Sequence, residues 1–137
     1  MLIYNNKELY EIPDFPGYYA TTNGSIYSVH TSKYIHKDCK DNKFHLLKCR
    51  LTRTGYARVY MRRQSTHRRE DVYVHRIIAT LFIPNPNHYP EVNHKDCNTL
   101  NNCVENLEWI THKENLEYGF LHGHKTRDVL GRFTYRE

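Results

Sequence analysis

Residues 91–120 read E-V-N-H-K-D-C-N-T-L-N-N-C-V-E-N-L-E-W-I-T-H-K-E-N-L-E-Y-G-F. The segment opens with a short alternation of apolar and polar residues that ends at Asn93-His94, and a polar loop over 95–102 follows. Residues 112–120 predict a helix, and the apolar positions before them predict a second strand at Val104, Leu107, Trp109 and Ile110. The segment therefore predicts strand, loop, strand and helix, in that order.

This order brings three polar residues into one neighbourhood. His94 ends the first strand, Asn106 begins the second, and Asn115 lies on the helix face between them. An Asn-His pair followed by Asn and Asn resembles the HNH endonucleases, in particular their phage and homing-type branch. The resemblance extends to V-H-R-I-I-A-T-L-F-I-P-N-P at 74–86, and in total it covers about a third of the chain. It implies a ββα-metal finger that holds one divalent cation.

The resemblance also implies which residues carry the chemistry. His94 is expected to be the general base, because a neutral imidazole can take a proton from water at physiological pH. Asn106 is expected to accept a hydrogen bond from the other ring N–H of His94 and so to fix its tautomer. Asn93 and Asn115 are expected to ligate Mg²⁺ or Mn²⁺, with phosphate and water as the remaining ligands.

The chain departs from the family pattern at both metal positions. Relatives frequently carry Asp where Asn93 stands, and many carry His where Asn115 stands. Two neutral amide oxygens bind a dication more weakly than a carboxylate does, so we expect low metal affinity until substrate arrives. The alternative interpretation treats the asparagines as a turn scaffold, a role that fits Asn98, Asn101 and Asn102.

Composition limits the classes of partner. The 137 residues carry a formal charge of +5 and a pI near 9.0, which suits a polyanion such as double-stranded DNA. The chain has no apolar run of about 18 residues and no secretion signal at its start, so no membrane association is expected. The resemblance implies action in the cytoplasm, the host cytoplasm if a phage encodes the protein.

The four cysteines are expected to be reduced thiols. Cys39, Cys49, Cys97 and Cys103 include no C-x-x-C pair, and their spacing does not suit a structural Zn²⁺ site. No other cofactor site is predicted.

An N-terminal hairpin is predicted around Asn23-Gly24, because both residues of such a turn are expected to take positive φ. A turn at 13–17 precedes it, and the segment resembles a small module at the front of phage homing endonucleases. A purely structural hairpin and a DNA-contacting one remain equally open. Residues 30–45 are polar and predict a loop or linker.

A second hairpin is predicted around Thr54-Gly55. Its second arm puts Tyr56, Arg58, Tyr60 and Arg62 on one face and Ala57, Val59 and Met61 on the other. The Arg/Tyr face indicates contact with a phosphate backbone, and a solvated face with extended side chains is the alternative.

The segment after this hairpin predicts a charged turn over 64–71 and a short core helix over 75–82 that Pro84 and Pro86 end. His75, at the helix start, is interpreted as a cap or a packed group, and a catalytic auxiliary is the alternative. Arg76 is predicted to contact a phosphate.

The sequence thus predicts an α+β fold with N-terminal antiparallel β-hairpins, a short central helix and the metal finger. Residues 1–55 would form a β-rich DNA-contacting module, 56–121 the nuclease core, and 122–137 a polar tail without a helical DNA-reading domain. We expect a metal-dependent DNA endonuclease that leaves 5′-phosphate and 3′-hydroxyl ends. The alternatives are a catalytically weak relic that binds DNA and a zinc-stabilised interaction module.

Overall fold

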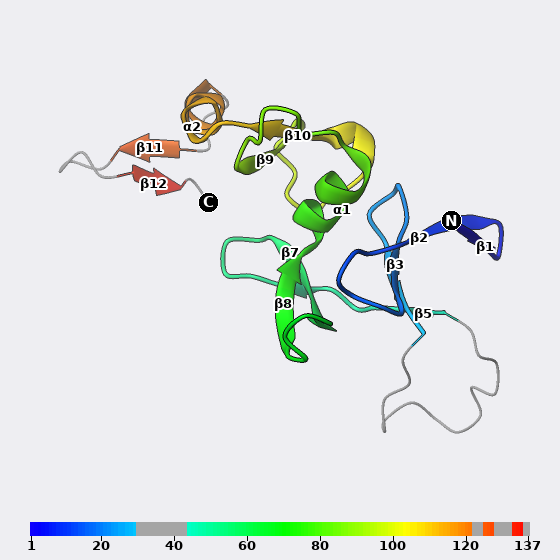
Figure 1. The fold of residues 1–137 in the computed structure, drawn as a ribbon. Helices are drawn as coiled ribbons and strands as arrows, with labels where there is room; N and C mark the ends of the chain where they lie inside the picture. The colour runs from blue at the N-terminus through cyan, green and yellow to red at the C-terminus, as the bar shows by residue number, and fades with distance from the viewer. Residues whose placement is uncertain (30–43, 122–124, 128–132, 136–137) are drawn as a thin grey trace.

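In the computed structural model, which describes residues 1–29, 44–121, 125–127 and 133–135, the chain adopts the predicted α+β fold (Figure 1). An N-terminal antiparallel sheet has the strand order β1-β2-β3-β4-β5. Its strands are β1 (Leu2–Tyr4), β2 (Lys7–Glu11), β3 (Tyr18–Ala20), β4 (Ile26–Ser28) and β5 (His45–Leu46). The predicted linker over 30–45 lies almost wholly outside the described residues.

The predicted hairpin at Asn23-Gly24 is confirmed as β3 and β4, with Ala20 opposite Ile26. Its turn differs from the expected one, because only Gly24 has a positive φ, of 91°. Thr21 N–H donates to the Ser25 carbonyl at 3.0 Å, and Gly24 N–H donates to the Thr21 carbonyl at 3.1 Å. These bonds close a three-residue loop whose last residue is left-handed, a common hairpin connection in which glycine suits that position.

The hairpin of β1 and β2 was not predicted. Its two turn residues, Asn5 and Asn6, have φ of 48° and 63°. Asparagine tolerates this left-handed conformation better than most residues, and two such residues in sequence form the turn that matches the twist of a hairpin. The Asn-Asn pair was therefore the available signal.

A three-stranded sheet follows, made of β6 (Arg50–Leu51), β7 (Ala57–Arg62) and β8 (Arg69–Tyr73). The predicted two faces of β7 are confirmed: Ala57, Val59 and Met61 are buried, and Tyr60 is 52% exposed. The predicted turn over 64–71 is wrong for its last residues. They form the edge strand β8, which pairs with β7 through the backbone while Arg69 and Asp71 face solvent.

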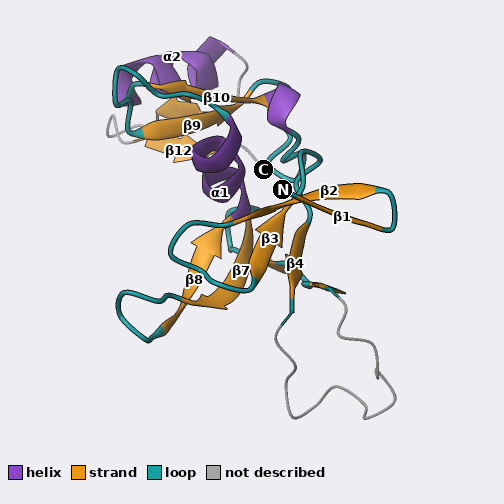
Figure 2. Cartoon of the chain, turned by 45° about the vertical axis from the view of Figure 1, so that its right-hand side comes forward, coloured by secondary structure: helices purple, strands orange, loops and turns teal. Residues whose placement is uncertain are grey.

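Helix α1 (Val74–Phe82) lies between the strands of the N-terminal half and the remainder of the fold (Figure 2). Ile77, Ile78 and Ala79 are buried, and Ile78 is fully enclosed. One apolar cluster joins α1 to both halves of the chain, from Ile12 to Leu107. Truncating a buried isoleucine of this kind to alanine costs about 2–5 kcal/mol. The predicted domain boundaries at 55/56 and 121/122 stay predictions.

The finger comprises β9 (Glu91–His94), a 3₁₀ turn η1 (Val104–Asn106), β10 (Leu107–Ile110) and α2 (His112–Leu121). Strands β9 and β10 are antiparallel, with Leu107 opposite His94 and Glu108 opposite Asn93. The predicted helix over 112–120 is confirmed, and the predicted strand begins three residues after Val104. In the predicted polar tail, β11 (Lys125–Arg127) pairs with β12 (Phe133–Tyr135). Neither helix of the described segments is long and apolar enough to cross a membrane.

Candidate active site

His94 is the last residue of β9, and its side chain is 5% exposed. Its Nε2 lies 2.8 Å from Oδ1 of Asn102, in the loop between β9 and β10. An amide oxygen can only accept a hydrogen bond, so Nε2 carries the proton and Nδ1 keeps a lone pair. This is the tautomer of a histidine that can accept a proton through Nδ1.

Burial lowers the pKa of His94, because the charged imidazolium loses its hydration there. The hydrogen bond to Asn102 and the carboxylate of Asp96 oppose that effect and favour the protonated ring. The net shift is downward from 6.5, so His94 is neutral at physiological pH. It can therefore act as a base rather than as an acid.

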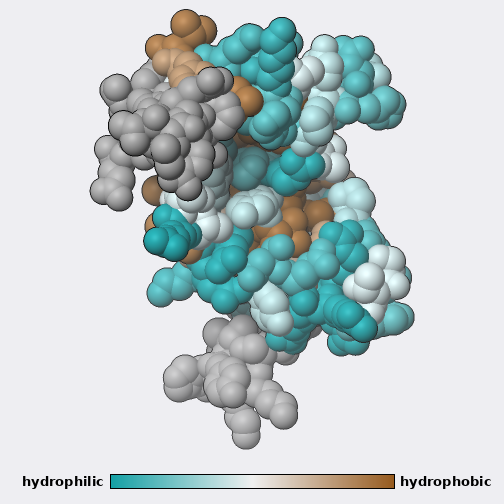
Figure 3. Space-filling model, turned by 90° about the vertical axis from the view of Figure 1, so that its left-hand side faces the viewer, coloured by the Kyte–Doolittle hydropathy of each residue, from teal (hydrophilic) through white to brown (hydrophobic). Residues whose placement is uncertain are grey.

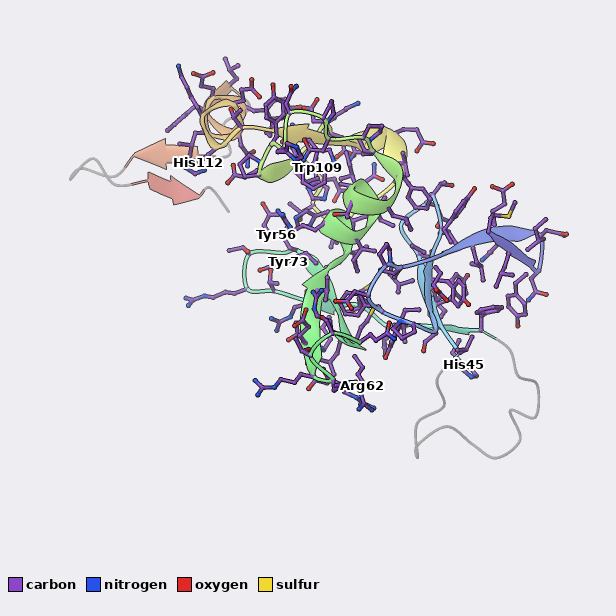
Figure 4. All side chains as sticks on the ribbon, in the orientation of Figure 1. His45, Tyr56, Arg62, Tyr73, Trp109 and His112 are labelled. Carbon is purple, nitrogen blue, oxygen red and sulfur yellow. The ribbon has the colours of Figure 1, made fainter. Side chains whose placement is uncertain are left out.

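Aromatic residues surround His94 on the side of β9 that faces α1. The His75 ring centre is 5.1 Å from that of His94, and the Tyr56 ring centre is 6.0 Å away. Tyr73 lies against Tyr56 with ring centres 6.2 Å apart, and both side chains are close to the finger (Figure 4). These contacts connect the outer face of the β6-β7-β8 sheet to the candidate base.

His75 is a packed residue, which is one of its two predicted structural roles, and it does not cap α1. Its side chain is 8% exposed, and the helix begins at Val74 with no side-chain cap. Burial lowers the pKa of His75 to about 3, and the positive charges that His94 and Arg76 can carry act in the same direction. Nδ1 of His75 is buried without a hydrogen-bond partner.

The predicted contact between Asn106 and His94 is wrong. Asn106 Oδ1 accepts from the backbone N–H of Asp96 at 3.0 Å, and its Nδ2 donates to Asp96 Oδ1 and to the Asn101 carbonyl, both at 2.8 Å. Its own carbonyl accepts from Lys95 N–H at 2.8 Å. Asn106 therefore closes the loop that begins after His94, and Asn102 holds the imidazole.

Asn93 points to the other side of β9, because successive side chains of a strand alternate. It is 6% exposed, and its Nδ2 donates to Glu108 Oε1 at 2.9 Å. The Tyr118 hydroxyl of α2 donates to the carbonyl of Lys95, two residues further along the chain, and Asn93 also influences the pKa of Tyr118. The structure thus brings Asn93 against α2, while His94 packs towards α1.

Asn115 is brought to the same side of β9 by Glu91. Its Nδ2 donates to Glu91 Oε2 at 3.2 Å, and the other carboxylate oxygen of Glu91 lies 2.9 Å from His112 Nδ1. Figure 4 shows His112 at the finger, near the start of α2. Glu91 and Asn93 are two positions apart and share a face. Both predicted metal ligands therefore lie between β9 and α2.

The donors at this face suit a hard divalent cation. Amide and carboxylate oxygens are the protein ligands of Mg²⁺, which commonly retains several waters. No three His, Cys, Asp or Glu side chains gather as a ligand group in the described segments. Cys49, Cys97 and Cys103 are free thiols, and Cys39 lies outside the described residues. The residues present fit a cation held by two amides, phosphate and water.

Three of the four predicted DNA-contacting residues share the outer face of β7. Arg58 Nη1 is 3.7 Å from Asp71, whose other oxygen pairs with Arg50. The Arg50 guanidinium lies 5.3 Å from the centre of the exposed Tyr60 ring. Arg62 is exposed near the far end of the β7-β8 hairpin (Figure 4).

Arg76 lies elsewhere, on α1. Its Nη1 donates to the Pro90 carbonyl at 3.0 Å, and its guanidinium is 5.8 Å from the centre of the Trp109 ring. Arg76 thus joins α1 to the finger, and its predicted contact with a phosphate stays a prediction.

The N-terminal hairpin touches the loop that orients His94. A Cβ built on Gly24 would lie 2.8 Å from the Asn102 carbonyl oxygen, and Val104 N–H donates to the Thr22 carbonyl at 2.9 Å. Sequence patterns do not indicate this support, because residues 22–24 and 102–104 are about 80 positions apart. The hairpin contributes buried side chains to the core, and its predicted contact with DNA stays a prediction.

Comparison with known proteins identifies several relatives of this chain. A family model described as HNH endonuclease matches residues 72–117. An "Uncharacterized HNH endonuclease L245" of Acanthamoeba polyphaga mimivirus is 34% identical over 113 residues, which make up 82% of this chain and 29% of that protein. The "DNA endonuclease I-HmuI" of Bacillus phage SP01 is 30% identical over 108 residues, 78% of this chain and 54% of that one.

A solved structure, "DNA binding and cleavage by the HNH homing endonuclease I-HmuI", matches the fold. The TM-score is 0.64 with 28% sequence identity, and the match covers 85% of this chain and 59% of that one. The chain spans less than two thirds of the length of each of these relatives.

Proposed function

The chain belongs to the HNH endonuclease family through residues 72–117, and on that premise we propose that it is a metal-dependent DNA endonuclease. It would hydrolyse phosphodiester bonds in double-stranded DNA and leave 5′-phosphate and 3′-hydroxyl ends. The observation that carries the proposal is the neutral, oriented His94 at the end of β9. The preceding residue, Asn93, lies on the opposite face of β9, next to the carboxylate of Glu108.

His94 would act through Nδ1. A water beside the scissile phosphate would give its proton to Nδ1 as it attacks phosphorus, while Asn102 keeps its hydrogen bond to Nε2–H. His75 stays neutral at physiological pH, so it adds no repulsion when His94 becomes an imidazolium. Asp96 favours that charged form and helps the transfer.

Asn93 and Asn115 would hold the divalent cation, Mg²⁺ or Mn²⁺, through their amide oxygens. When bound, it would offset negative charge on the phosphate and on the departing 3′ oxygen. Because Asn93 and His94 lie on opposite faces of β9, the scissile phosphate would sit at the end of this strand, where both faces are reachable.

The DNA backbone would follow the outer face of the β6-β7-β8 sheet towards Tyr56 and Tyr73. Arginines and tyrosines of this face, such as Arg62 and Tyr60, are the side chains that commonly contact phosphates. Seen from the side in Figure 3, the surface is largely hydrophilic, with apolar areas near its centre and at its upper edge. The formal charge of +5 supports binding to a polyanion.

The test is cleavage of a supercoiled plasmid by the purified chain, with and without Mg²⁺ or Mn²⁺. We expect relaxed or linear DNA only with metal, and none with His94→Ala. DNA ligase should reseal the product directly, because it needs a 5′-phosphate and a 3′-hydroxyl. Metal-independent cleavage would contradict the proposal.

A catalytically weak relic is the second candidate. Two neutral amides in place of stronger ligands are the observation that favours it. That candidate would bind DNA in a salt-sensitive manner and leave the plasmid intact with either metal.

A further inference from the structure

Carboxylates hold the amide groups of both expected metal ligands. Asn93 Nδ2 donates to Glu108 Oε1 at 2.9 Å, between residues that lie opposite one another in the β9-β10 pair. Asn115 Nδ2 donates to Glu91 Oε2 at 3.2 Å, from α2 to β9. An ionised carboxylate only accepts hydrogen bonds, so each amide presents its NH₂ group to it and turns its oxygen away.

We propose that Glu91 and Glu108 are positioning residues for a divalent cation, and that they provide the negative charge which Asn93 and Asn115 lack as ligands. The inference rests on the proposed function, because it assumes that these two amide oxygens ligate the cation. Glu91 would act through Asn115, and Glu108 would act through Asn93.

Each hydrogen bond has two effects on the ligand. It fixes the direction in which the amide oxygen points, and it draws electron density towards that oxygen, which strengthens the oxygen as a ligand. Each carboxylate also lies on the far side of its asparagine from the expected cation, so its negative charge attracts the cation without direct contact. An Asn ligand backed by Glu thus resembles an Asp ligand in net charge.

The two carboxylates are held in place, unlike a mobile surface acid. Glu91 is 31% exposed in its side chain and is engaged on one oxygen by Asn115 and on the other by His112. Glu108 is partly buried and faces the buried side chain of Asn93. Glu117 of α2, by contrast, is exposed and provides a control with the same charge.

The test measures Mn²⁺ binding by electron paramagnetic resonance, with duplex DNA present and His94→Ala in every protein so that the DNA stays intact. Glu91→Gln and Glu108→Gln keep an oxygen that can accept from the amide and remove only the charge. We expect each to weaken Mn²⁺ binding by about 10- to 100-fold, the usual size of such second-layer effects. Glu117→Gln should bind Mn²⁺ as the parent does.

A charge exchange separates positioning from direct ligation. Asn93→Asp combined with Glu108→Gln moves the negative charge onto the ligand, and Mn²⁺ affinity should return to within a few-fold of the parent. If affinity does not return, Glu108 is itself a ligand and the positioning role is overturned.

The remaining outcomes distinguish this inference from the proposed function. If Asn93→Ala weakens Mn²⁺ binding while both Glu→Gln variants match Glu117→Gln, this inference fails and the metal site stands. If Asn93→Ala and Asn115→Ala leave Mn²⁺ binding unchanged, the proposed site fails and takes the inference with it. Thermal melts of each variant identify any loss of fold.

Discussion

A methyl group at position 24 would lie 2.8 Å from the carbonyl oxygen of Asn102 and 2.9 Å from its Cβ, because Gly24 packs directly on that residue. Asn102 in turn holds Nε2 of His94. The N-terminal hairpin therefore supports the orientation of the candidate base, from a position about 80 residues earlier in the chain.

Gly24→Ala should slow cleavage more than Gly55→Ala. Both glycines have positive φ, 91° and 89°, so both variants carry similar backbone strain of about 1–2 kcal/mol. Only at Gly24 does the new Cβ collide with Asn102, since the nearest contact at Gly55 is Thr99 Oγ1 at 3.5 Å. Displacement of a catalytic group costs up to about 100-fold in rate. Single-turnover cleavage below both melting temperatures measures the difference, and equal losses would refute the support role.

The cleavage rate should rise with pH through an apparent pKa below 6.5. Burial lowers the pKa of His94, and the base acts only when neutral, so activity should persist in mildly acidic buffer. His94→Ala should lower the rate by about 10²–10⁴-fold, with DNA binding nearly intact. The measurement is a single-turnover pH profile at saturating Mn²⁺. An inflection well above 6.5 would argue against His94 as the base.

His75 should make the fold sensitive to acid. Its pKa is about 3 in the folded protein, against about 6.5 in an unfolded chain. The unfolded state binds a proton more readily between these values, so stability is fully present above pH 6.5 and is lost as the pH falls towards 3. The loss is at most about 1.4 kcal/mol per pH unit.

His75→Phe should flatten this dependence, because a phenyl ring does not titrate. It also removes the buried Nδ1 that has no partner, so the variant should fold without a large loss at pH 7. Urea unfolding at pH 7.0, 5.5 and 4.5 compares the two proteins. If the free energy of unfolding fell by the same amount with pH in both proteins, His75 would not be the acid-sensitive group.

Arg62→Ala should flatten the salt dependence of DNA binding more than Arg58→Ala. Each neutralised phosphate contributes about −0.9 to the slope of log K against log salt. Arg58 shares Asp71 with Arg50, so part of its charge is already balanced. Asp71→Asn should therefore steepen the slope. Binding titrations at several salt concentrations measure these slopes. Identical slopes in all variants would mean that the outer face of β7 is solvated and does not contact DNA.

Sequence alone predicted what depends on local pattern. The alternation in β7 identified its buried face, and helical spacing of apolar residues identified α1. Residues 69–71 were misassigned because their side chains are polar, and pairing with β7 decides their conformation. Pairing between distant segments leaves little trace in a short window of sequence.

The loop asparagines show the same limit within the site. Asn98, Asn101, Asn102 and Asn106 have identical side chains, and only the path of the loop decides which one reaches His94. Motif spacing favoured Asn106 as the partner of His94. In the structure the Asn106 amide donates to Asp96, and Asn102 holds the imidazole instead. The roles of Glu91 and Glu108 also went unpredicted, because opposite positions in a strand pair depend on register.

The alternation of side chains along β9 has a consequence for how such a site can evolve. Asn93 and His94 are adjacent in the chain, yet one packs towards α2 and the other towards α1. A substitution that alters cation preference is therefore confined to one side of the sheet and leaves the surroundings of the imidazole intact. Inserting or deleting one residue within β9 would exchange the two sides and disable both at once. Natural variation in this strand should accordingly tolerate exchange of one oxygen ligand for another at position 93, and it should not tolerate a change of length.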